Sequence, residues 1–390
     1  MDENPFPREL LHDVLSTVET GGRPVGGSEK DSHGIPSLGG ENLKMDGSLD
    51  LEGIRRIPNE FYLSMRAGHL EPGDVLINKD GAQTGKVAQY GGEYPEAAIN
   101  EHLFLLRSST AIDQGYLFRV LFSDEIQRDI KSLITGSAQP GLNRVFLKRV
   151  RLPVPPLKEQ KHIAEILDSL DQTIQATEQL ITKHRKIRQG LAHDLLKNTV
   201  NNTLSYYADI NSENLGSDTP KDFRFEYLEL SNVSNGSVIR VEKMTFGAAP
   251  SRARRIARKG DFLFGTVRPL QKSHAWATKD CIASTGFAVL RAKQGQADSR
   301  FLGHFLLTEE VTLLASKFAV GSGYPALGER DLAAFQFPDL PLEKQKRIAA
   351  ILDSADLAIQ ENEAELAKLQ KLRSGLASDL LSGRVRTVAA

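Results

Sequence analysis

The sequence contains one cysteine, Cys281, and no long hydrophobic run. A single cysteine excludes a disulfide framework and a cysteine-rich zinc site, and it favours a reducing compartment. The polar start MDENPFPRELL is unlike a signal peptide, and no apolar stretch reaches the roughly 18 residues of a membrane span. The nine histidines are dispersed and lack the spacing of metal ligands on a helix. We therefore expect a cytoplasmic protein with no membrane partner and no bound metal.

Catalytic and nucleotide-binding motifs are also missing from the chain. It has no G-x-S-x-G, no H-E-x-x-H and no glycine fingerprint that opens a dinucleotide fold. The stretch GAQTGK (81–86) is one residue short of a phosphate-binding loop, and Val87 stands where that loop has a hydroxyl for magnesium. NPFP (4–7) lacks the second adjacent proline of the Asn-Pro-Pro-aromatic motif of amino-methyltransferases. These absences predict a chain that binds and positions its ligands and is not itself an enzyme.

What the sequence does contain is a repeat. Residues 160–175 read QKHIAEILDSLDQTIQ, and residues 345–360 read QKRIAAILDSADLAIQ. The match extends without a gap from 153–196 onto 338–381, with 24 of 44 positions identical. Each copy follows a proline-containing lead-in, which is a good start for a helix because proline lacks the N–H that would be left unsatisfied there. The repeat predicts two helices of the same kind at the ends of two halves of the chain.

Apolar residues in both copies recur with the alternating spacing of four and three that is typical of a coiled-coil seam. The same polar interruptions occur at the same offsets, Thr177 with Asn362 and Arg188 with Arg373, as expected if the two helices pair. The alternative is two surface helices that lie on separate domains. About 40 helical residues would form a rod of roughly 60 Å, which suits a spacer. The predicted seam consists of Ile163, Leu167, Leu170, Ile174, Thr177, Ile181, Leu191, Ile348, Leu352, Ile359, Asn362, Leu366, Leu369 and Leu376.

Weaker sequence similarities between the two halves precede each helix. ITGSAQPGL (134–142) corresponds to AVGSGYPAL (319–327), and GDVLI (73–77) corresponds to GDFLF (260–264). The chain is long enough for two independent cores, and its 40% hydrophobic and 25% charged residues are near average. We expect an α/β (α+β) fold with an internal pseudo-twofold repeat: two globular domains, separated by two long antiparallel coiled-coil helices. The predicted segments are 1–155, 156–197, 198–340 and 341–390.

Two regions of the globular halves indicate a binding surface. In the first half, the glycine-rich turn after GDVLI would present Lys79, Gln83, Thr84 and Lys86 to a ligand, although a plain turn between strands is an equal alternative. In the second half, residues 250–300 contain 11 Lys or Arg against 3 acids, within a chain of net charge −1. Such clustering predicts a polyanion partner, and its alternative is a solvated charged face.

The loop GTVRPLQKSHAW (265–276) lies within this basic segment and contains Arg268, Gln271, Lys272 and His274. Arginine can bond guanine through two hydrogen bonds and glutamine can bond adenine in the same way, so the loop is a plausible base-reading surface. The segment NRVFLKRVR (143–151) gives the first half a basic edge of its own.

The duplicated segment PL-x-x-Q-x-x-IA-x-IL-D, which each time follows a domain with GD-[hydrophobic]-L, resembles the specificity subunit of type I restriction–modification systems. The resemblance covers essentially the whole chain. It implies a non-catalytic reader of double-stranded DNA in phage defence, in which 1–155 and 198–340 are target-recognition domains for the two halves of a bipartite sequence. The helices would set the gap between half-sites and dock two methyltransferase subunits.

The resemblance further implies that S-adenosylmethionine, ATP and magnesium belong to the methyltransferase subunits and the restriction/translocase subunits, with no cofactor in this chain. The alternatives are a specificity subunit of a methylation-only or other phage-defence system, and a non-catalytic coiled-coil scaffold. No motif of the family assigns base contacts, so the candidates are chosen by their chemistry. The DNA-binding candidates are Lys79, Gln83, Thr84, Lys86, Gln139, Asn143, Arg144, Arg252, Arg254, Arg255, Arg268, Gln271, Lys272 and Tyr324.

Overall fold

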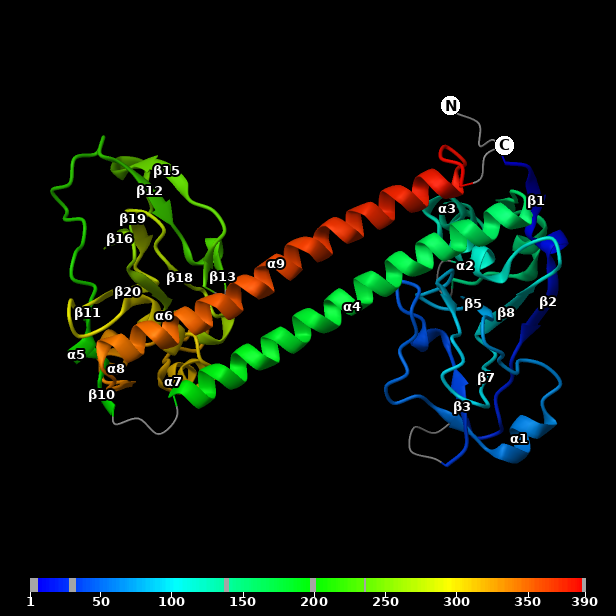
Figure 1. The fold of residues 1–390 in the computed structure, drawn as a ribbon, viewed down its shortest axis with the longest axis horizontal. Coiled ribbons are helices and arrows are strands. Elements are labelled where there is room, and N and C mark those ends of the chain that lie inside the picture. Colours follow the sequence, from blue (N-terminus) through cyan, green and yellow to red (C-terminus); the bar gives the residue numbers. More distant parts are fainter. Residues whose placement is uncertain (1–5, 28–32, 137–139, 197–200, 235, 388–390) are drawn as a thin grey trace. The chain divides into compact units, whose positions relative to one another are not determined.

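The structure is a computed structural model, and it describes residues 6–27, 33–136, 140–196, 201–234 and 236–387 (Figure 1). The chain divides into two compact units: unit 1 is Met1–Ala176 with Leu366–Ala390, and unit 2 is Thr177–Glu365. Each unit holds one globular lobe and one half of each of the two long helices, α4 (Leu157–Leu196) and α9 (Leu342–Leu381). The mixed helix and sheet class expected from the sequence is confirmed.

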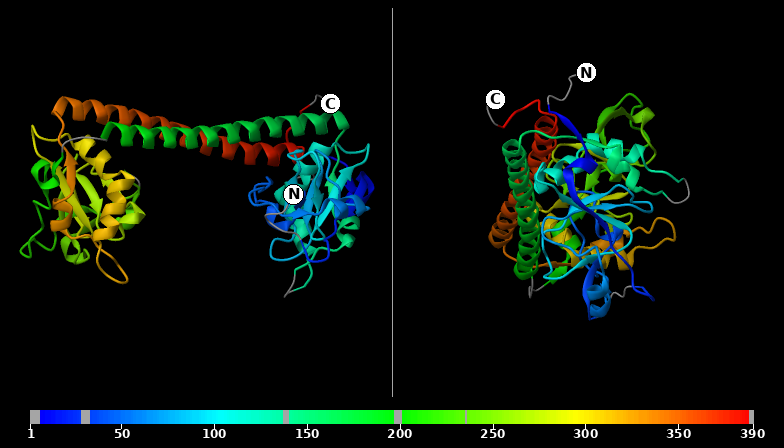
Figure 2. Two further views of the ribbon diagram at one scale, coloured as in Figure 1. Left: turned by 90° about the horizontal axis from the view of Figure 1, so that it is seen from below. Right: turned by 90° about the vertical axis from the view of Figure 1, so that its right-hand side faces the viewer.

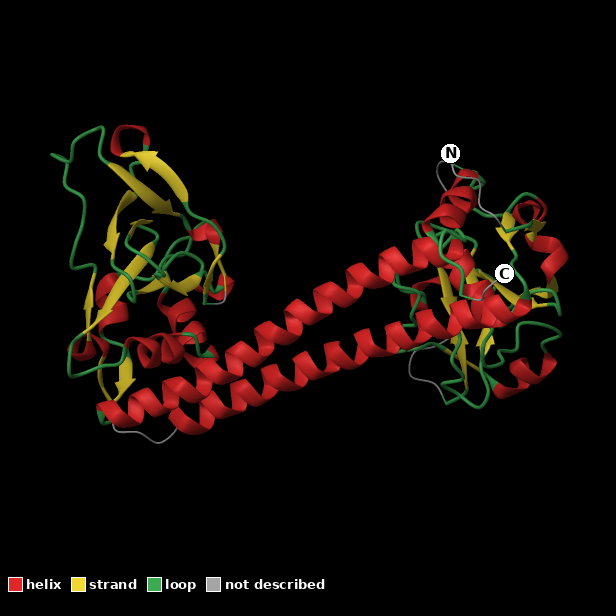
Figure 3. Cartoon of the chain, turned by 45° about the horizontal axis from the view of Figure 1, so that its top comes forward, coloured by secondary structure: helices red, strands yellow, loops and turns green. Residues whose placement is uncertain are grey.

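The lobe of unit 1 contains small sheets and short helices (Figure 3). Its strands are β1 (Arg8–Leu10), β2 (Leu15–Thr20), β3 (Ile35–Leu38), β4 (Arg56–Ile57), β5 (Val75–Asn78), β6 (Val87–Gln89), β7 (Ala98–Ile99), β8 (Leu103–Ser108) and β9 (Arg151–Pro153). Its helices are α1 (Asn59–Ser64), α2 (Gln114–Phe122) and α3 (Asp124–Ser132), with 3-10 turns at Leu11–Val14, Gly40–Asn42 and Arg144–Lys148. One sheet has the antiparallel order β2-β8-β5-β6, and the second has the order β4-β3-β7 with β3 and β7 parallel.

The lobe of unit 2 repeats this plan. Its strands are β10 (Asn201–Thr203), β11 (Ala208–Ile210), β12 (Arg224–Leu228), β13 (Val233–Ser234), β14 (Ser237–Val238), β15 (Glu242–Thr245), β16 (Ala253–Ala257), β17 (Phe262–Gly265), β18 (His274–Trp276), β19 (Cys281–Ser284), β20 (Phe287–Ala292) and β21 (Gln336–Pro338). Its helices are α5 (Leu204–Tyr207), α6 (Ser299–Leu306), α7 (Glu309–Phe318) and α8 (Glu329–Ala333), with 3-10 turns at Leu230–Asn232, Phe246–Ala248 and Pro269–Gln271. The sheet order β11-β20-β17-β18 matches β2-β8-β5-β6, and β12 pairs in parallel with β19 as β3 does with β7.

The core of each lobe continues onto the long helices, which lie side by side at its edge (Figure 2). In unit 1, Ile163 and Leu167 of α4 and Leu380 of α9 are buried in the same cluster as Tyr116 of α2. Unit 2 forms the corresponding cluster from Ile348 and Leu352 of α9, with Leu191 of α4 packed against it. The start of each helix is therefore part of a lobe's core and not a free rod.

A buried glutamine joins each helix to its lobe. In unit 1, the Oε1 atom of Gln160 accepts from the backbone N–H of Asp113 at 2.7 Å, and its Nε2 donates to the carbonyl of Pro155 at 2.7 Å and that of Ala111 at 3.2 Å. Gln345 makes the same three bonds in unit 2, to residues 298, 340 and 296. Both glutamine side chains are fully buried, and each satisfies three backbone groups at the point where lead-in, lobe and helix meet.

The predicted antiparallel pairing of the helices is confirmed within each unit. Arg373 of α9 donates to Asp171 of α4 at 2.6 Å in unit 1, and Arg188 of α4 donates to Asp356 of α9 at 2.8 Å in unit 2. The arginines that interrupt the seam pattern thus form ion pairs between the helices. Among the seam polar residues, Asn362 donates to the carbonyl of Ala358. Ile163, Leu167, Ile181, Ile348 and Leu352 are buried, and the other predicted seam residues are half-buried.

The junction between lobe and helix pair is chemically different in the two units. In unit 1, Arg119 of α2 is 7% exposed and forms ion pairs with Asp168 and Asp171. The equivalent residue in unit 2 is the fully buried His304, whose Nε2 lies 2.7 Å from Asp353. Arg188 lies 3.2 Å from the Nδ1 atom of this ring. The guanidinium can only donate, so Nδ1 is the acceptor and His304 is neutral with its proton on Nε2.

This difference predicts a pH dependence confined to unit 2. Burial lowers the pKa of His304, and the nearby carboxylates Asp353 and Asp356 oppose that shift only in part. Because the folded state then binds fewer protons than the unfolded chain, the stability of this junction is present at neutral pH and falls as the pH drops below about 6.5. Amide hydrogen exchange at pH 7.5 and pH 5.5 should show loss of protection in α6 but not in α2, where Arg119 stays charged.

The variant His304→Gln is the control, because it removes the titrating group and keeps a donor at this position. Its α6 should exchange alike at the two pH values, apart from any effect of the second buried histidine of the lobe, His274. Equal loss of protection in α2 and α6 of the unchanged protein would contradict the prediction.

Candidate nucleic-acid interface

Two stretches lie together in the unit 1 lobe: the glycine-rich loop 79–86 between β5 and β6, and the described residues 134–136 and 140–142 of the second segment. The backbone N–H of Gly81 donates to the carbonyl of Pro140 at 2.9 Å, and that of Leu142 donates to Lys79 at 2.7 Å. The Thr84 hydroxyl adds a bond to Pro140 at 3.1 Å. The structure therefore brings together two stretches that the sequence singled out for separate reasons.

Unit 2 builds the same pair of loops from residues 266–273 and 319–327. The N–H of Arg268 donates to Pro325 at 2.8 Å, and that of Leu327 donates to Thr266 at 2.9 Å. The guanidinium of Arg268 lies over the Tyr324 ring, 4.4 Å from its centroid, and donates to the carbonyl of Gly323. Two candidates that are 56 positions apart in the chain are thus in direct contact.

The loop of unit 2 has an unusual backbone. Arg268 has φ 49° and Lys272 has φ 51°, so both adopt the left-handed conformation on either side of the 3-10 turn Pro269–Gln271. Residues with a side chain avoid this region, at a cost of roughly 1–2 kcal/mol each. The side chains of Leu270 and Gln271 are exposed as a result of this tight turn. Such conformations concentrate at binding sites, where the surrounding structure holds them.

The position of His274, which follows this loop, differs from the expectation from the sequence. The sequence predicts that it shares a binding surface with Arg268 and Gln271. In the structure it is fully buried and stacks on Phe264 with ring centroids 4.2 Å apart. Its Nδ1 accepts from the N–H of Gly265 at 2.9 Å. Burial lowers the pKa of His274 to about 4, so the ring is neutral near pH 7 and acts as a hydrogen-bond acceptor at the start of the loop.

The candidates of unit 1 are largely engaged with their own lobe. Lys79 pairs with Asp80 at 2.7 Å, and Lys86 donates to Gln83 at 2.6 Å. Asn143 caps the 3-10 turn that follows it, and Arg144 donates to a carbonyl of β2. Gln139 lies outside the described residues. The loop of unit 1 is therefore held more tightly and carries less free charge than that of unit 2.

The basic segment of unit 2 is less positive than its composition suggests. Arg252 forms an ion pair with Glu229, and Arg255 donates to Asn214 and lies 3.9 Å from Glu329. These acids come from outside residues 250–300, and the sequence count could not include them. Arg254 instead lies over the Phe246 ring, 4.6 Å from its centroid.

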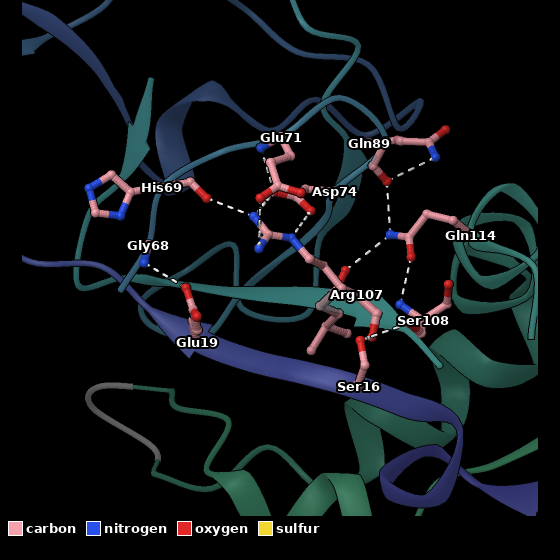
Figure 4. A network of polar contacts seen from close by, with 12 residues as sticks. Ser16, Glu19, Gly68, His69, Glu71, Asp74, Gln89, Arg107, Ser108 and Gln114 are labelled. Atoms are coloured by element: carbon pink, nitrogen blue, oxygen red, sulfur yellow. Dashed lines mark hydrogen bonds and ion pairs between the residues drawn. The ribbon is translucent and has the colours of Figure 1, made fainter. Parts of the chain in front are cut away.

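The motif GD-[hydrophobic]-L has a structural role that the sequence did not reveal. In unit 1, the Asp74 carboxylate accepts from Arg107 at 2.7 Å and from the backbone N–H of Glu71 at 2.8 Å (Figure 4). In unit 2, Asp261 accepts from Arg291 at 3.0 Å and from the N–H of Arg258 at 2.8 Å. Each aspartate is at least 95% buried and fixes the strand from which a candidate loop emerges. The candidate loops are therefore positioned by residues that do not belong to them.

Within the described part of the chain, no three His, Cys, Asp or Glu side chains gather as metal ligands would. No helix in the same residues combines the length and hydropathy that crossing a bilayer requires.

Comparison with known proteins gives matches over nearly the whole chain. A family model described as Type I restriction modification DNA specificity domain matches residues 13–183 and 220–371. A Methanocaldococcus jannaschii protein named as the MjaX specificity subunit of a type I restriction enzyme is 24% identical over 409 residues, covering 96% of this chain and 92% of its own. The MjaVIII specificity subunit of the same organism is 23% identical over 348 residues, covering 80% and 79%. The type I S subunit from M. genitalium has the same fold, with a TM-score of 0.62 at 15% identity over 97% of each chain.

The left-handed residues of the unit 2 loop generate a test of its backbone. The free energy of unfolding of Lys272→Gly should exceed that of Lys272→Ala by about 1 kcal/mol, because glycine adopts a positive φ without strain and alanine does not. Both variants remove the same charge, so each controls for the other. Urea unfolding followed by circular dichroism measures the difference, and equal stabilities would show that residue 272 is not held at positive φ.

Proposed function

The chain belongs to the family of type I restriction modification DNA specificity domains, and from this premise we propose that it reads a bipartite DNA sequence with one lobe per half-site. The observation that carries the proposal is the pair of bridged loops that both lobes build from equivalent positions. The backbone bonds are the same, from Gly81 to Pro140 and from Arg268 to Pro325. A shared frame with different side chains is what two readers of different base sequences require.

The side chains on the two frames differ in the way this function needs. Unit 1 presents Gln83 and Thr84 on a glycine-rich loop, and unit 2 presents Arg268 and Gln271 beside Tyr324. Arginine and glutamine are the residues that most readily form two hydrogen bonds with guanine and adenine in the major groove. Lysines and arginines beside these loops would contact phosphates, which position the protein without carrying sequence information.

The long helices have a surface that suits a partner bound twice. Ile166 and Ile351 occupy equivalent positions and are 39% and 40% exposed, and Ile187 and Leu372 are likewise equivalent at 47% and 55%. Exposed apolar side chains that both copies keep, although the lobes have diverged, support the proposal that each copy binds the same protein. We assign this surface to two methyltransferase subunits.

The chemistry then belongs to those partners. The methyltransferase subunits would supply S-adenosylmethionine, and a restriction/translocase subunit would supply ATP hydrolysis with magnesium and DNA cleavage. This chain would be the non-catalytic reader of a cytoplasmic complex in phage defence. The continuous 40-residue helices α4 and α9, each shared by both units, would fix the gap between the half-sites.

Exchange of one lobe tests the assignment of half-sites. Replacing residues 198–337 with the recognition lobe of another specificity subunit should change one half of the methylated motif and leave the other half unchanged. The reason is that each lobe has its own core and its own pair of loops. Sequencing of methylated bases in a host that carries the complex measures this. If both half-sites changed in a chimera that still binds methyltransferase, the two lobes would read DNA jointly.

Charge placed on the exposed helix surface tests the docking. Ile187→Glu and Leu372→Glu should each weaken binding of the methyltransferase subunit roughly tenfold or more, because burying an unpaired carboxylate replaces a favourable apolar contact. Leu63→Glu on α1, which is 70% exposed on a lobe, is the matched control and should bind normally. Titration of purified chain with methyltransferase subunits measures the affinities. Unchanged binding by both helix variants would place the docking surface elsewhere.

A further inference from the structure

Unit 1 contains a polar pocket of about 270 Å³ beside the glycine-rich loop. Its polar lining is Arg23, Ser37, Glu41, Arg55, Asn100 and His102. The Nδ1 atom of His102 lies 3.2 Å from Asp80, and the carbonyl of His102 accepts from the N–H of Lys79 at 2.9 Å. The pocket therefore adjoins the pair of loops that would read the first half-site.

The charges in this pocket alternate in sign. Arg55 contacts Glu41 through Nε at 3.3 Å, and Arg23 contacts Glu101 at 3.6 Å. Both terminal nitrogens of the Arg55 guanidinium lack a hydrogen-bond partner among the described residues. The side chains of Arg55 and Glu41 are 41% and 53% exposed, so both reach solvent. The pocket thus offers donors and an acceptor next to one another.

This arrangement disfavours a phosphate and fits the edge of a base pair. A DNA phosphate would meet the Glu41 carboxylate at the same place as the Arg55 guanidinium, and the repulsion would offset the attraction. A G·C pair instead presents the two acceptors of guanine, O6 and N7, and the amino donor of cytosine, N4, in the major groove. Arginine bonds the first and a carboxylate accepts from the second.

Resting on the proposed function, we infer that Arg55 and Glu41 read a G·C base pair in the first half-site. Arg55 donates to guanine O6 and N7, and Glu41 accepts from cytosine N4. The pair is a specificity determinant that neither the loop residues nor the basic segment includes.

Gly39 has no side chain and so leaves room for the ends of Glu41 and Asn100 at this pocket. A Cβ atom at Gly39 would lie 2.4 Å from the Glu41 carboxylate and 2.6 Å from the Asn100 amide, although the extended backbone at Gly39 (φ −125°, ψ −179°) allows any residue. An alanine at this position would therefore fit the backbone but would push aside the ends of the Glu41 and Asn100 side chains. A methyl group at residue 39 would displace the carboxylate without removing a charge.

In unit 2 an ion pair stands at the position equivalent to Gly39. The parallel pairs Leu38 with Ile99 in unit 1 and Leu228 with Ala283 in unit 2 align the two lobes at this point. The residue that follows is Gly39 in unit 1, and it is Glu229 in unit 2, where it forms an ion pair with Arg252. The two lobes therefore differ at this place, and we expect substitutions in the pocket to affect one half-site.

The test compares Arg55→Ala with Arg56→Ala. These neighbours lose the same charge, but Arg56 donates to the carbonyl of Gly34 at 2.7 Å and does not line the pocket. In a host that carries the whole complex, the methylated motif of the Arg55→Ala protein should lose its requirement for G·C at one position of the first half-site. Discrimination there should fall roughly 5- to 150-fold. Arg56→Ala should keep the original motif.

Two further variants guard against a failure to fold. Glu41→Gln keeps the shape of the side chain, and Gly39→Ala keeps every charge; both should relax the same position and leave the second half-site intact. Weaker methylation of all sites with an unchanged motif would assign Arg55 to a phosphate and overturn the inference, as would identical motifs for Arg55→Ala and Arg56→Ala. Absence of any bipartite motif for the unchanged protein would overturn the proposed function, and the inference with it.

Discussion

The arrangement of each unit depends on one buried side chain, the glutamine at the start of each long helix. Gln160 and Gln345 are inaccessible to water and use all their strong bonding groups on the backbone at the point where lead-in, lobe and helix meet. An apolar residue there would remove the bonds to one N–H and two carbonyls, and each of these groups that water cannot reach would cost roughly 1–3 kcal/mol. With the glutamine in place, the angle at which the helix leaves the lobe is fixed by hydrogen bonds and not by packing alone.

Other polar groups solve the same problem differently in the two units. Arg119 neutralises two aspartates of α4 in unit 1, and the neutral His304 takes its place in unit 2. Unit 1 also buries Glu159, where unit 2 has the exposed Lys344. Hydrogen bonds from Arg386 hold the pKa of Glu159 below its usual range, so the segment after α9 is tied to the start of α4 by an ion pair. The two units thus share the hydrogen bonds of the buried glutamine, but they differ in the charged residues around it.

The same contrast extends to the binding loops. In both lobes a buried aspartate paired with an arginine fixes the strand, and the backbone of a proline-containing segment fixes the loop that follows. The side chains of the loops are free to differ because the loops are held by bonds of their backbone. Unit 1 leaves a pocket beside Gly39, and unit 2 fills that place with the pair Glu229–Arg252 and builds its loop on left-handed residues. A stable frame with variable tips is a physical basis for changing recognition without changing the fold.

The sequence by itself determined the repeat and the two long helices and predicted their pairing, because a seam of apolar residues is a local and periodic property. It also indicated which segments form loops, since glycine and proline mark turns in any context. Only the tertiary structure decided which charges are free. Arg252 and Arg255 look like a basic patch in the sequence but meet acids from distant segments, and His274 looks exposed but is buried. The pocket of Arg55 and Glu41 carries no sequence motif at all. Its residues come from separate turns and strands, and electrostatics depends on distances in space that the order of residues does not contain.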